Sequence, residues 1–492
     1  MKFKNISNYI LIIILCAVSF AIYINSLNGD FLIDDQTTIL NNGQIKDLKI
    51  YLVKYFKIRV GAFYELIRVL NWHISGDNPF SYHLFNVLAH SGCVILIFIL
   101  CNVLFNNKAL SFLSSLIFAV HPIHTEAVSW ISGGNYVFSS LFFITAFIFY
   151  IKSDRSLFNL TLSIIAFSLC LLSGNTVATL PIMFILYDIF FRQKNIGNAG
   201  LTGFRILVLC LVMAIAVIFV GIFFVTKNNF MHIIFYFRGF GYLIVAAKAF
   251  VYYLKILYLP LHLGLYHPFA FDVVNIQSIS PTLFLSIAIL ITAVVLFLKY
   301  RRTFKPLSFG IMWFLVTYAP YSNIIPICNI ISERYLYLPS VGSSVVIAAL
   351  FLKVWEIINR NVQYRTSLRF LCIAVITLFL GSYSTLTMKR NYEYNNIISY
   401  WQSNINNFKD GYIVYNNLAG TYYQMGNLHN AIAYCWINLM INPNQPYVWC
   451  NLGKVYTDLG DYNAAQFCYK EALKVDKNYF PAIKALEGLK GK

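Results

Sequence analysis

Charged residues are scarce in this sequence. Only 11% of its 492 residues are Asp, Glu, Lys or Arg, whereas 59% are hydrophobic and 17% are aromatic. A soluble chain carries about a quarter charged residues and could not bury this much apolar surface in its cores. The composition therefore excludes a soluble protein. It predicts a polytopic membrane protein, whose first partner is the lipid bilayer.

Acidic residues are scarcer still. The sequence has 19 Asp and Glu residues against 37 Lys and Arg residues, which gives a formal charge of +18 at pH 7. Basic residues beside membrane spans are explained by the orientation rule and by anionic headgroups. We therefore do not expect a nucleic acid as a partner.

The cysteine spacings of a disulfide framework or a zinc site are also missing. Several cysteines, Cys93 and Cys101 among them, lie inside apolar runs, where a thiol behaves as a small hydrophobic group. Cys435, Cys450 and Cys468 lie in a polar C-terminal region without any Cys-x-x-Cys spacing. Cysteine therefore does not identify the compartment.

Apolar runs recur along most of the chain. Each approaches the roughly 20 residues that a membrane-spanning helix needs, and they predict about eleven spans. The spans are expected near 9–24, 84–105, 109–121, 134–151, 156–173, 176–191, 205–225, 282–298, 307–325, 338–355 and 370–387. Lys2 and Lys4 precede the first run, and no Ala-x-Ala-like cleavage site ends it. We interpret it as a retained signal anchor rather than a signal peptide.

The basic residues between the runs predict the orientation. Those on the same predicted side as Lys2 and Lys4 lie at Lys108 and within 152–155, 192–194, 299–305 and 360–369. Under the positive-inside rule, the N-terminus is cytosolic, whereas loop 25–61 and the C-terminal region are outside.

The segment 241–261 is ambiguous. It is apolar enough to span, but Lys248 and Lys255 lie near one helical face. A twelfth span would put the basic residues 299–305 on the wrong side of the membrane. We therefore predict an external interfacial helix.

After Tyr383 the composition becomes polar and a period of 34 residues appears. It aligns Leu418 with Leu452, and Ala431 with Ala465. This spacing resembles the tetratricopeptide repeat, a helix-turn-helix unit that stacks into an α-solenoid. We predict an all-α protein with a transmembrane region at 1–388, a connector at 389–411, repeats at 412–445 and 446–479, and a partial cap at 480–492.

Three acids are candidate catalytic residues on the predicted outer side. Asp34 and Asp35 follow the first span, and each can act as a base or a metal ligand or remain a solvated loop acid. Glu126, in His121-Pro-Ile-His124-Thr-Glu, lies near a helix N-terminus. It either caps that helix or faces the same cavity as the two aspartates.

Basic and imidazole side chains form two further candidate groups on that side. Arg68, His83 and His90 run into the second span, where the histidines share a helical face and can bind an anion or metal, or bond to neighbouring helices. Arg334, in Glu333-Arg334-Tyr335, can hold a phosphate bidentately or extend to lipid headgroups.

Acids are nearly missing from the interiors of the predicted spans. Asp188 and Glu356 both lie near the cytosolic ends. A transporter would need ionisable residues near the midplane of the membrane. The charge layout therefore favours chemistry at one surface.

Together, these motifs resemble a known family. They are the loop Asp34-Asp35, the run 82–86 with His90, the run 121–128, the stretch 313–323 with 333–339, and the C-terminal repeats. The combination is similar to the transmembrane and tetratricopeptide-repeat O-mannosyltransferases and their bacterial relatives. The resemblance covers nearly the whole chain.

The resemblance implies a C-type glycosyltransferase fold. The donor would be a sugar, a mannose-like hexose first, on a polyprenyl (dolichyl or undecaprenyl) phosphate, and the acceptor a protein or glycan outside. Asp34 and Asp35 would activate the acceptor hydroxyl for inverting transfer, with a divalent metal left open. Arg334 would stabilise the phosphate with Arg68, His83 and His90, and the cavity would be completed by Glu126, His121, His124, Glu333 and Tyr335.

Two departures from the resemblance keep other functions open. Where relatives carry an Arg and an acid, this chain has Gly134-Asn135-Tyr136, and where they carry Lys-Glu it has Gly174-Asn175. One alternative is an inactive membrane scaffold that docks partners through its repeats. Another is a transporter of lipid-linked glycans. The composition favours a bacterial inner membrane over the endoplasmic reticulum.

Overall fold

The structure is a computed structural model. It describes residues 7–55, 59, 61–153, 156–192, 241–264, 281–324, 327, 329–360, 365–405 and 411–489. Within these ranges the chain forms helices and turns and no strand, which confirms the predicted all-α class. Two compact units are present, Met1–Leu263 with Phe271–Tyr392, and Gly264–Ala270 with Glu393–Lys492.

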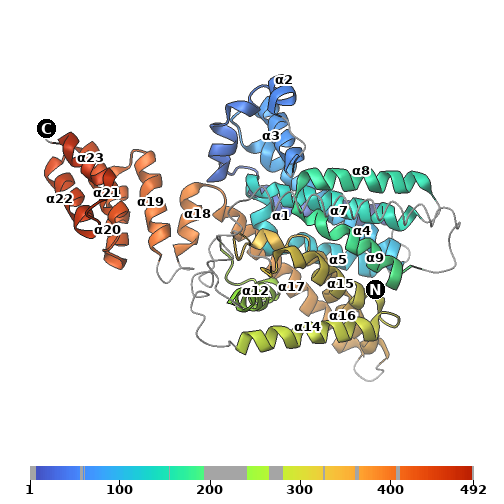
Figure 1. Ribbon diagram of the computed structural model, residues 1–492. Coiled ribbons are helices and arrows are strands. Elements are labelled where there is room, and N and C mark those ends of the chain that lie inside the picture. Colours follow the sequence, from blue (N-terminus) through green and yellow to red (C-terminus); the bar gives the residue numbers. More distant parts are fainter. Residues whose placement is uncertain are drawn as a thin grey trace. The chain divides into compact units, whose positions relative to one another are not determined.

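The first unit is built from helices joined mostly by short turns (Figure 1). Its longer helices are α1 Asn8–Tyr23, α3 Ala62–Ser75, α4 Phe80–Phe105, α5 Lys108–Val120, α7 Gly134–Lys152, α8 Leu157–Ser173, α9 Leu180–Phe190, α12 Gly241–Tyr258, α14 Pro281–Tyr300, α15 Lys305–Tyr318, α16 Ser340–Arg360 and α17 Arg365–Glu393. Two short helices, α2 Leu48–Ile50 and α6 Thr125–Val128, lie between them.

Several of these helices are membrane-spanning candidates. Among the described residues, six helices are long and apolar enough to cross a bilayer: Asn8–Ser26, Phe80–Phe105, Ile131–Lys152, Pro281–Tyr300, Ser340–Arg360 and Thr366–Glu393. Three shorter apolar helices are Lys108–Val120, Leu157–Ser173 and Val177–Phe190. These helices indicate an integral membrane protein, whereas the total of eleven spans stays a prediction. The run at 205–225 lies outside the described residues.

The segment predicted as an interfacial helix forms α12. Its residues Val245, Ala249 and Tyr253 are buried against the rest of the first unit. The helix is therefore confirmed, and one side of it belongs to the protein core. Its position in the membrane interface stays a prediction.

Close backbone approach joins α15 to α16. A Cβ atom added at Gly310 would lie 2.5 Å from the carbonyl oxygen of Gly342. A Cβ atom added at Gly342 would likewise meet the carbonyl oxygen of Gly310. Small residues allow membrane helices to approach in this way. Trp313, one turn from Gly310, is fully buried and donates its ring N–H to the carbonyl of Leu338 at 2.9 Å.

The second unit is a stack of helix pairs. Its helices are α18 Ile397–Ser403, α19 Tyr412–Gln424, α20 Leu428–Ile441, α21 Pro446–Leu459, α22 Tyr462–Val475 and α23 Phe480–Leu489. The first helices of successive pairs begin 34 residues apart, at 412, 446 and 480. This register confirms the predicted repeat.

Two positions that the 34-residue period aligns are buried in both repeats. Leu418, Leu452, Ala431 and Ala465 are all buried. A Cβ atom added at Gly453 would lie 2.7 Å from the ring of Tyr469, so the two helices of this repeat touch there.

Replacing Gly310 by alanine is expected to destabilise the first unit. The added methyl group would meet the Gly342 carbonyl and Val346, and overpacking of this kind costs about 1–3 kcal/mol. Thermal unfolding of the purified protein in detergent measures the loss. Gly381→Ala is the control, because no atom of the described residues lies within 4 Å of the added atom there. Equal melting temperatures for the two variants would contradict the close approach.

Candidate functional site

A buried turn between α5 and α7, residues 121–133, is the centre of the candidate site. Pro122 cannot continue α5, because it lacks an N–H and restricts the preceding residue. The chain instead forms a 3-10 turn at Pro122–His124, the short helix α6 and a second 3-10 turn at Ile131–Gly133. Apart from the partly buried Ser132, all of these residues are buried. The sequence therefore folds this segment inward.

Glu126 of this turn is held by the segment 332–334. Its carboxylate accepts hydrogen bonds from the Ser332 hydroxyl at 2.9 and 3.1 Å and from the backbone N–H of Arg334 at 2.9 Å. It also forms an ion pair with the Arg334 guanidinium. The side chain is 2% exposed. The structure thus joins two predicted site residues, with Glu126 holding Arg334 in place.

The guanidinium of Arg334 is enclosed by aromatic rings. Its central carbon lies 5.2 Å from the ring centre of Trp130, 5.7 Å from Tyr136 and 5.6 Å from Tyr335. Tyr321 stacks on Tyr335 at 4.6 Å. Cation–π contacts strengthen when water is excluded. The arginine is therefore a rigid positive charge and not a mobile surface side chain.

Asp35 is a second buried charge, held beside the same turn. Its carboxylate accepts hydrogen bonds from the Ser132 hydroxyl and from the Leu32 backbone N–H, the latter at 3.0 Å. Burial raises the pKa of Asp35 to about 6, although both hydrogen bonds and the charge of Arg68 oppose the rise. The preceding Ile33 has a φ of 38°, which is strained for a β-branched residue. This strain accompanies the inward turn of Asp35.

Asp34 points the other way. Its side chain is exposed, and its backbone carbonyl accepts hydrogen bonds from the hydroxyls of Thr37 at 3.0 Å and Thr38 at 2.7 Å. The two adjacent acids thus have different environments.

Within the part of the chain that the structure describes, no group of three His, Cys, Asp or Glu side chains is arranged to hold a metal ion.

Arg68 completes the cluster around Asp35. Its terminal nitrogen lies 3.4 Å from the Ser132 hydroxyl, and its guanidinium lies 4.9 Å from the ring centre of Tyr64. The Nε atom of Arg68 is buried, and no described residue accepts a hydrogen bond from it. A buried cationic donor of this kind offers a position for an anion.

Asn86 and Tyr64 fix the end of the turn. The Asn86 amide donates to the carbonyls of Trp130 and Ile131, both at 3.3 Å, and the Tyr64 hydroxyl also donates to Ile131. They fill the space beside Gly134, where an added Cβ atom would lie 2.7 Å from Asn86 Cγ. A larger residue at position 134 would displace this clamp.

The two departures from the family resemblance are neighbours. A Cβ atom added at Gly174 would lie 3.0 Å from the Ser139 hydroxyl and 3.8 Å from the carbonyl of Asn135. Gly174 therefore packs directly on the start of α7.

The four predicted site histidines are tied into the helix core. His83 contacts the Gly29 carbonyl at 3.1 Å, His90 the Tyr337 hydroxyl at 2.7 Å, His121 the Leu257 carbonyl at 2.9 Å and His124 the Ser340 hydroxyl at 2.7 Å. Each side chain is at most 1% exposed. One ring nitrogen of each thus joins two elements. Their predicted roles toward phosphate or substrate stay predictions.

Glu333 forms a second buried ion pair, with Arg390. The two side chains are 0% and 5% exposed and approach to 2.7 Å. Asn391 then accepts a hydrogen bond from Ser129 at 2.9 Å and donates to the Ile22 carbonyl at 2.8 Å. The end of α17 therefore fastens both the 333 segment and the 121–133 turn.

Sequence reasoning missed three side chains that connect these charges, Ser132, Arg390 and Asn391, and gave no role to Ser332, which stands beside Glu333 in the sequence. Arg390 and Asn391 follow the predicted span 370–387 in a polar stretch, and basic residues at a span end, here Lys389 and Arg390, resemble an orientation signal. Serines have no distinctive spacing.

Comparison with protein-family models identifies the C-terminal repeats. Two models, both described as tetratricopeptide repeat, match residues 412–435 and 446–479. The second unit therefore contains tetratricopeptide repeats. No solved structure matches the chain.

Curated relatives match nearly the whole chain. It is 24% identical to human protein O-mannosyl-transferase TMTC3 over 96% of this chain and 56% of the human protein. A protein O-mannosyl-transferase of Caenorhabditis elegans is 24% identical over 95% of this chain and 63% of its own length. A shorter stretch, 28% of the chain, is 34% identical to 18% of protein O-mannosyl-transferase tmtc2 of Xenopus laevis.

These similarities confirm the family resemblance predicted from the motifs. The chain spans little more than half the length of the human relative it matches. The three relatives are animal proteins, so a bacterial inner membrane stays a prediction, as does the orientation in the bilayer.

Removing the guanidinium of Arg390 is expected to unfold the site at lower temperature. Arg390→Ala leaves the Glu333 carboxylate buried without its ion pair, which costs about 3–5 kcal/mol. Arg390→Lys should recover part of the loss. Thermal unfolding compares them with Arg360→Ala, which breaks an exposed pair with Glu356. The buried pair is unimportant if Arg390→Ala and Arg360→Ala melt together.

Proposed function

We propose that this protein is a membrane glycosyltransferase. It moves a mannose-like hexose from a polyprenyl phosphate to a hydroxyl of a protein or glycan on the outer face of the membrane. The observation that carries the proposal is the buried Asp35 carboxylate, whose pKa is raised to about 6 beside Ser132 and Arg68. A carboxylate with a pKa near neutrality suits a general base. The similarity to proteins named O-mannosyl-transferases supports the sugar and the reaction class.

Asp35 is the proposed base. It takes the proton of the acceptor hydroxyl while that oxygen attacks the anomeric carbon of the donor sugar. The bond from this carbon to the phosphate oxygen breaks, and polyprenyl phosphate leaves from the opposite face with inversion. General-base assistance contributes about 10²- to 10⁴-fold. The Ser132 hydroxyl donates a hydrogen bond to one oxygen of the Asp35 carboxylate and so orients the carboxylate.

Two arginines are proposed to receive the leaving phosphate. Arg334 is fixed by Glu126 and by its aromatic surroundings, so little reorganisation is needed as negative charge develops. Arg68 has a buried Nε donor without an acceptor in the part of the chain that the structure describes. Because Glu126 already accepts from Ser332 and Arg334, we assign it a positioning role toward Arg334.

The tetratricopeptide repeats are proposed to recruit the protein acceptor. Such repeats expose an extended surface built from stacked helix pairs. The same repeats also fit the alternative that the chain is an inactive scaffold. The uncharged stretches Gly134-Asn135-Tyr136 and Gly174-Asn175 favour that alternative. The two functions differ in whether sugar transfer requires Asp35.

Neutralising Asp35 is expected to abolish sugar transfer. Asp35→Asn should lower the rate about 10²- to 10⁴-fold, because the amide cannot accept the hydroxyl proton. Membranes containing the full chain are supplied with radiolabelled dolichyl phosphate mannose and, separately, undecaprenyl phosphate mannose, and label in protein is counted. Asp34→Asn is the matched control, because Asp34 is the adjacent residue and its side chain is exposed. Transfer by Asp35→Asn at the wild-type rate would favour the scaffold.

The transfer rate is expected to depend on pH through Asp35. The base acts when deprotonated, and its pKa is about 6. The rate should therefore rise about tenfold per pH unit below 6 and level off above it. A rate profile between pH 4.5 and 8 in the same membranes tests this. A flat profile would remove Asp35 as the base.

A further inference from the structure

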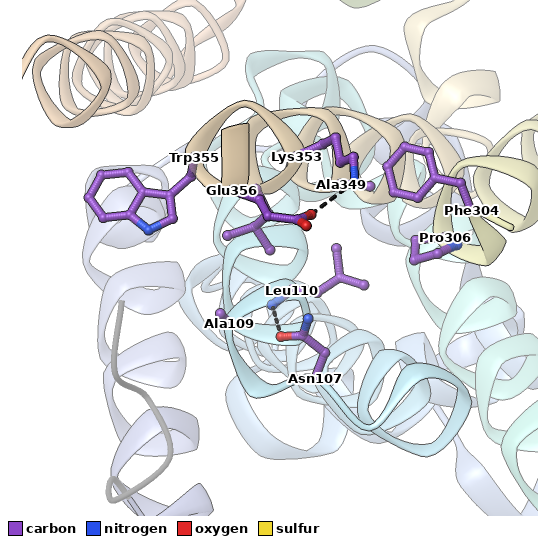
Figure 2. A pocket seen from close by; sticks show the side chains of 10 residues that line it. Asn107, Ala109, Leu110, Phe304, Pro306, Ala349, Lys353, Trp355 and Glu356 are labelled. Carbon is purple, nitrogen blue, oxygen red and sulfur yellow. Dashed lines mark hydrogen bonds and ion pairs between the residues drawn. The ribbon is translucent and has the colours of Figure 1, made fainter. Parts of the chain in front are cut away.

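A cavity lies in the first unit between the start of α5, the α14–α15 turn and the end of α16. Its volume is about 340 Å³, within the range of small-ligand sites. Figure 2 shows Lys353 and Glu356 of α16 on the side of Leu110 and Phe304, whereas the ring of Trp355 points away from them. The lining residues are Asn107, Ala109, Leu110, Phe304, Pro306, Ala349, Leu352, Lys353, Trp355 and Glu356.

This cavity is distant from the candidate catalytic site. Helix α5 runs from Lys108 at the cavity to Val120, directly before His121. Helix α16 runs from Ser340, which contacts His124, to the cavity-lining Glu356. At 1.5 Å per residue these helices separate the two places by about 20–25 Å along their axes. That distance approaches the thickness of a bilayer core.

Positive charge collects at the cavity end of the helices. The basic residues in the three lining segments and their flanks are Lys108, Lys299, Arg301, Arg302, Lys305, Lys353 and Arg360, and the acid among them is Glu356. This is the end that the positive-inside rule assigns to the cytosol. The surroundings therefore suit an anion at a membrane surface, where anionic lipids concentrate.

Lys353 is the basic side chain among the lining residues, and Glu356 is the acidic one. Lys353 forms an ion pair with Glu356 at 2.9 Å and is about half exposed. Arg360 holds the other carboxylate oxygen of Glu356. Lys353 can thus turn to a ligand while Glu356 keeps a partner.

Seven of the ten lining residues have apolar side chains. The side chains of Phe304, Leu110 and Leu352 would contact the hydrocarbon part of a lipid. Free phosphate has no hydrocarbon part and would leave these side chains without a contact. Trp355 lies beneath the guanidinium of Arg369 at 5.8 Å. Tryptophan beside basic residues is typical of the membrane–water interface.

We propose that this cavity binds the headgroup of an anionic glycerophospholipid. Lys353 contacts the phosphate, and the apolar lining covers the glycerol and the first methylene groups. The ligand differs from the sugar donor, and the site is independent of the proposed transfer reaction.

Native mass spectrometry of the full chain in detergent tests the proposal. The protein is titrated with dioleoylphosphatidylglycerol, with dioleoylphosphatidylcholine, and with inorganic phosphate as competitor. Phosphatidylglycerol should bind more tightly than phosphatidylcholine, and Lys353→Gln should weaken it about tenfold, as expected for one charged contact. Ala109→Phe, which places a ring in the cavity, should weaken both lipids.

Lys474→Gln is the matched control. Lys474 pairs with Glu471 three residues away, as Lys353 pairs with Glu356, but it lies in the second unit. It should bind phosphatidylglycerol like the wild type. Equal binding by Lys353→Gln, Ala109→Phe and Lys474→Gln would overturn the proposal. So would equal affinity for the two lipids, or displacement of phosphatidylglycerol by an equal concentration of phosphate, which would indicate a site for the free anion.

Discussion

The need to pair buried charges organises the candidate site. Glu333 and Arg334 are adjacent in sequence, but their partners lie on different elements, Arg390 on α17 and Glu126 on α6. An unpaired ion in a low-dielectric interior is strongly destabilising, so each pair has to form as the helices assemble. The segment 332–334 is consequently fixed from two sides, and its arginine cannot move far without breaking a buried contact.

The 121–133 turn connects the fixed arginine, Arg334, to Asp35. Within a few residues it carries Glu126, which holds Arg334, and Ser132, which holds Asp35. Trp130, between them, covers the Arg334 guanidinium. The proposed base and the proposed phosphate-binding cation are thus positioned by one short segment. Pre-organisation of this kind is what electrostatic catalysis requires, because the charges are set before the reaction begins.

The sequence was sufficient to nominate most of these charges but not to pair them. A carboxylate or guanidinium at a membrane boundary is costly, so Asp35, Glu126 and Arg334 were conspicuous against an apolar background. Their partners lie tens to hundreds of residues away, and a single sequence does not report such distances. It also could not rank Asp35 over Asp34, because the difference arises from a local backbone turn at Ile33. The 34-residue period, in contrast, predicted the repeats directly, since each unit packs against its neighbour in sequence.

The environment of Asp35 is informative because it opposes stability. A pKa raised from 3.8 to about 6 means that the folded protein binds the proton more tightly than the unfolded chain. With respect to this group, stability is greatest below pH 4, falls as the pH rises to 6, and stays lower by about 3 kcal/mol above that. Glu126 and Glu333, by comparison, each have an arginine as a direct ion-pair partner. Asp35 instead accepts a hydrogen bond from Ser132, and Arg68 acts on it only through its nearby charge. A carboxylate kept buried at such a cost is better explained by a chemical role than by packing.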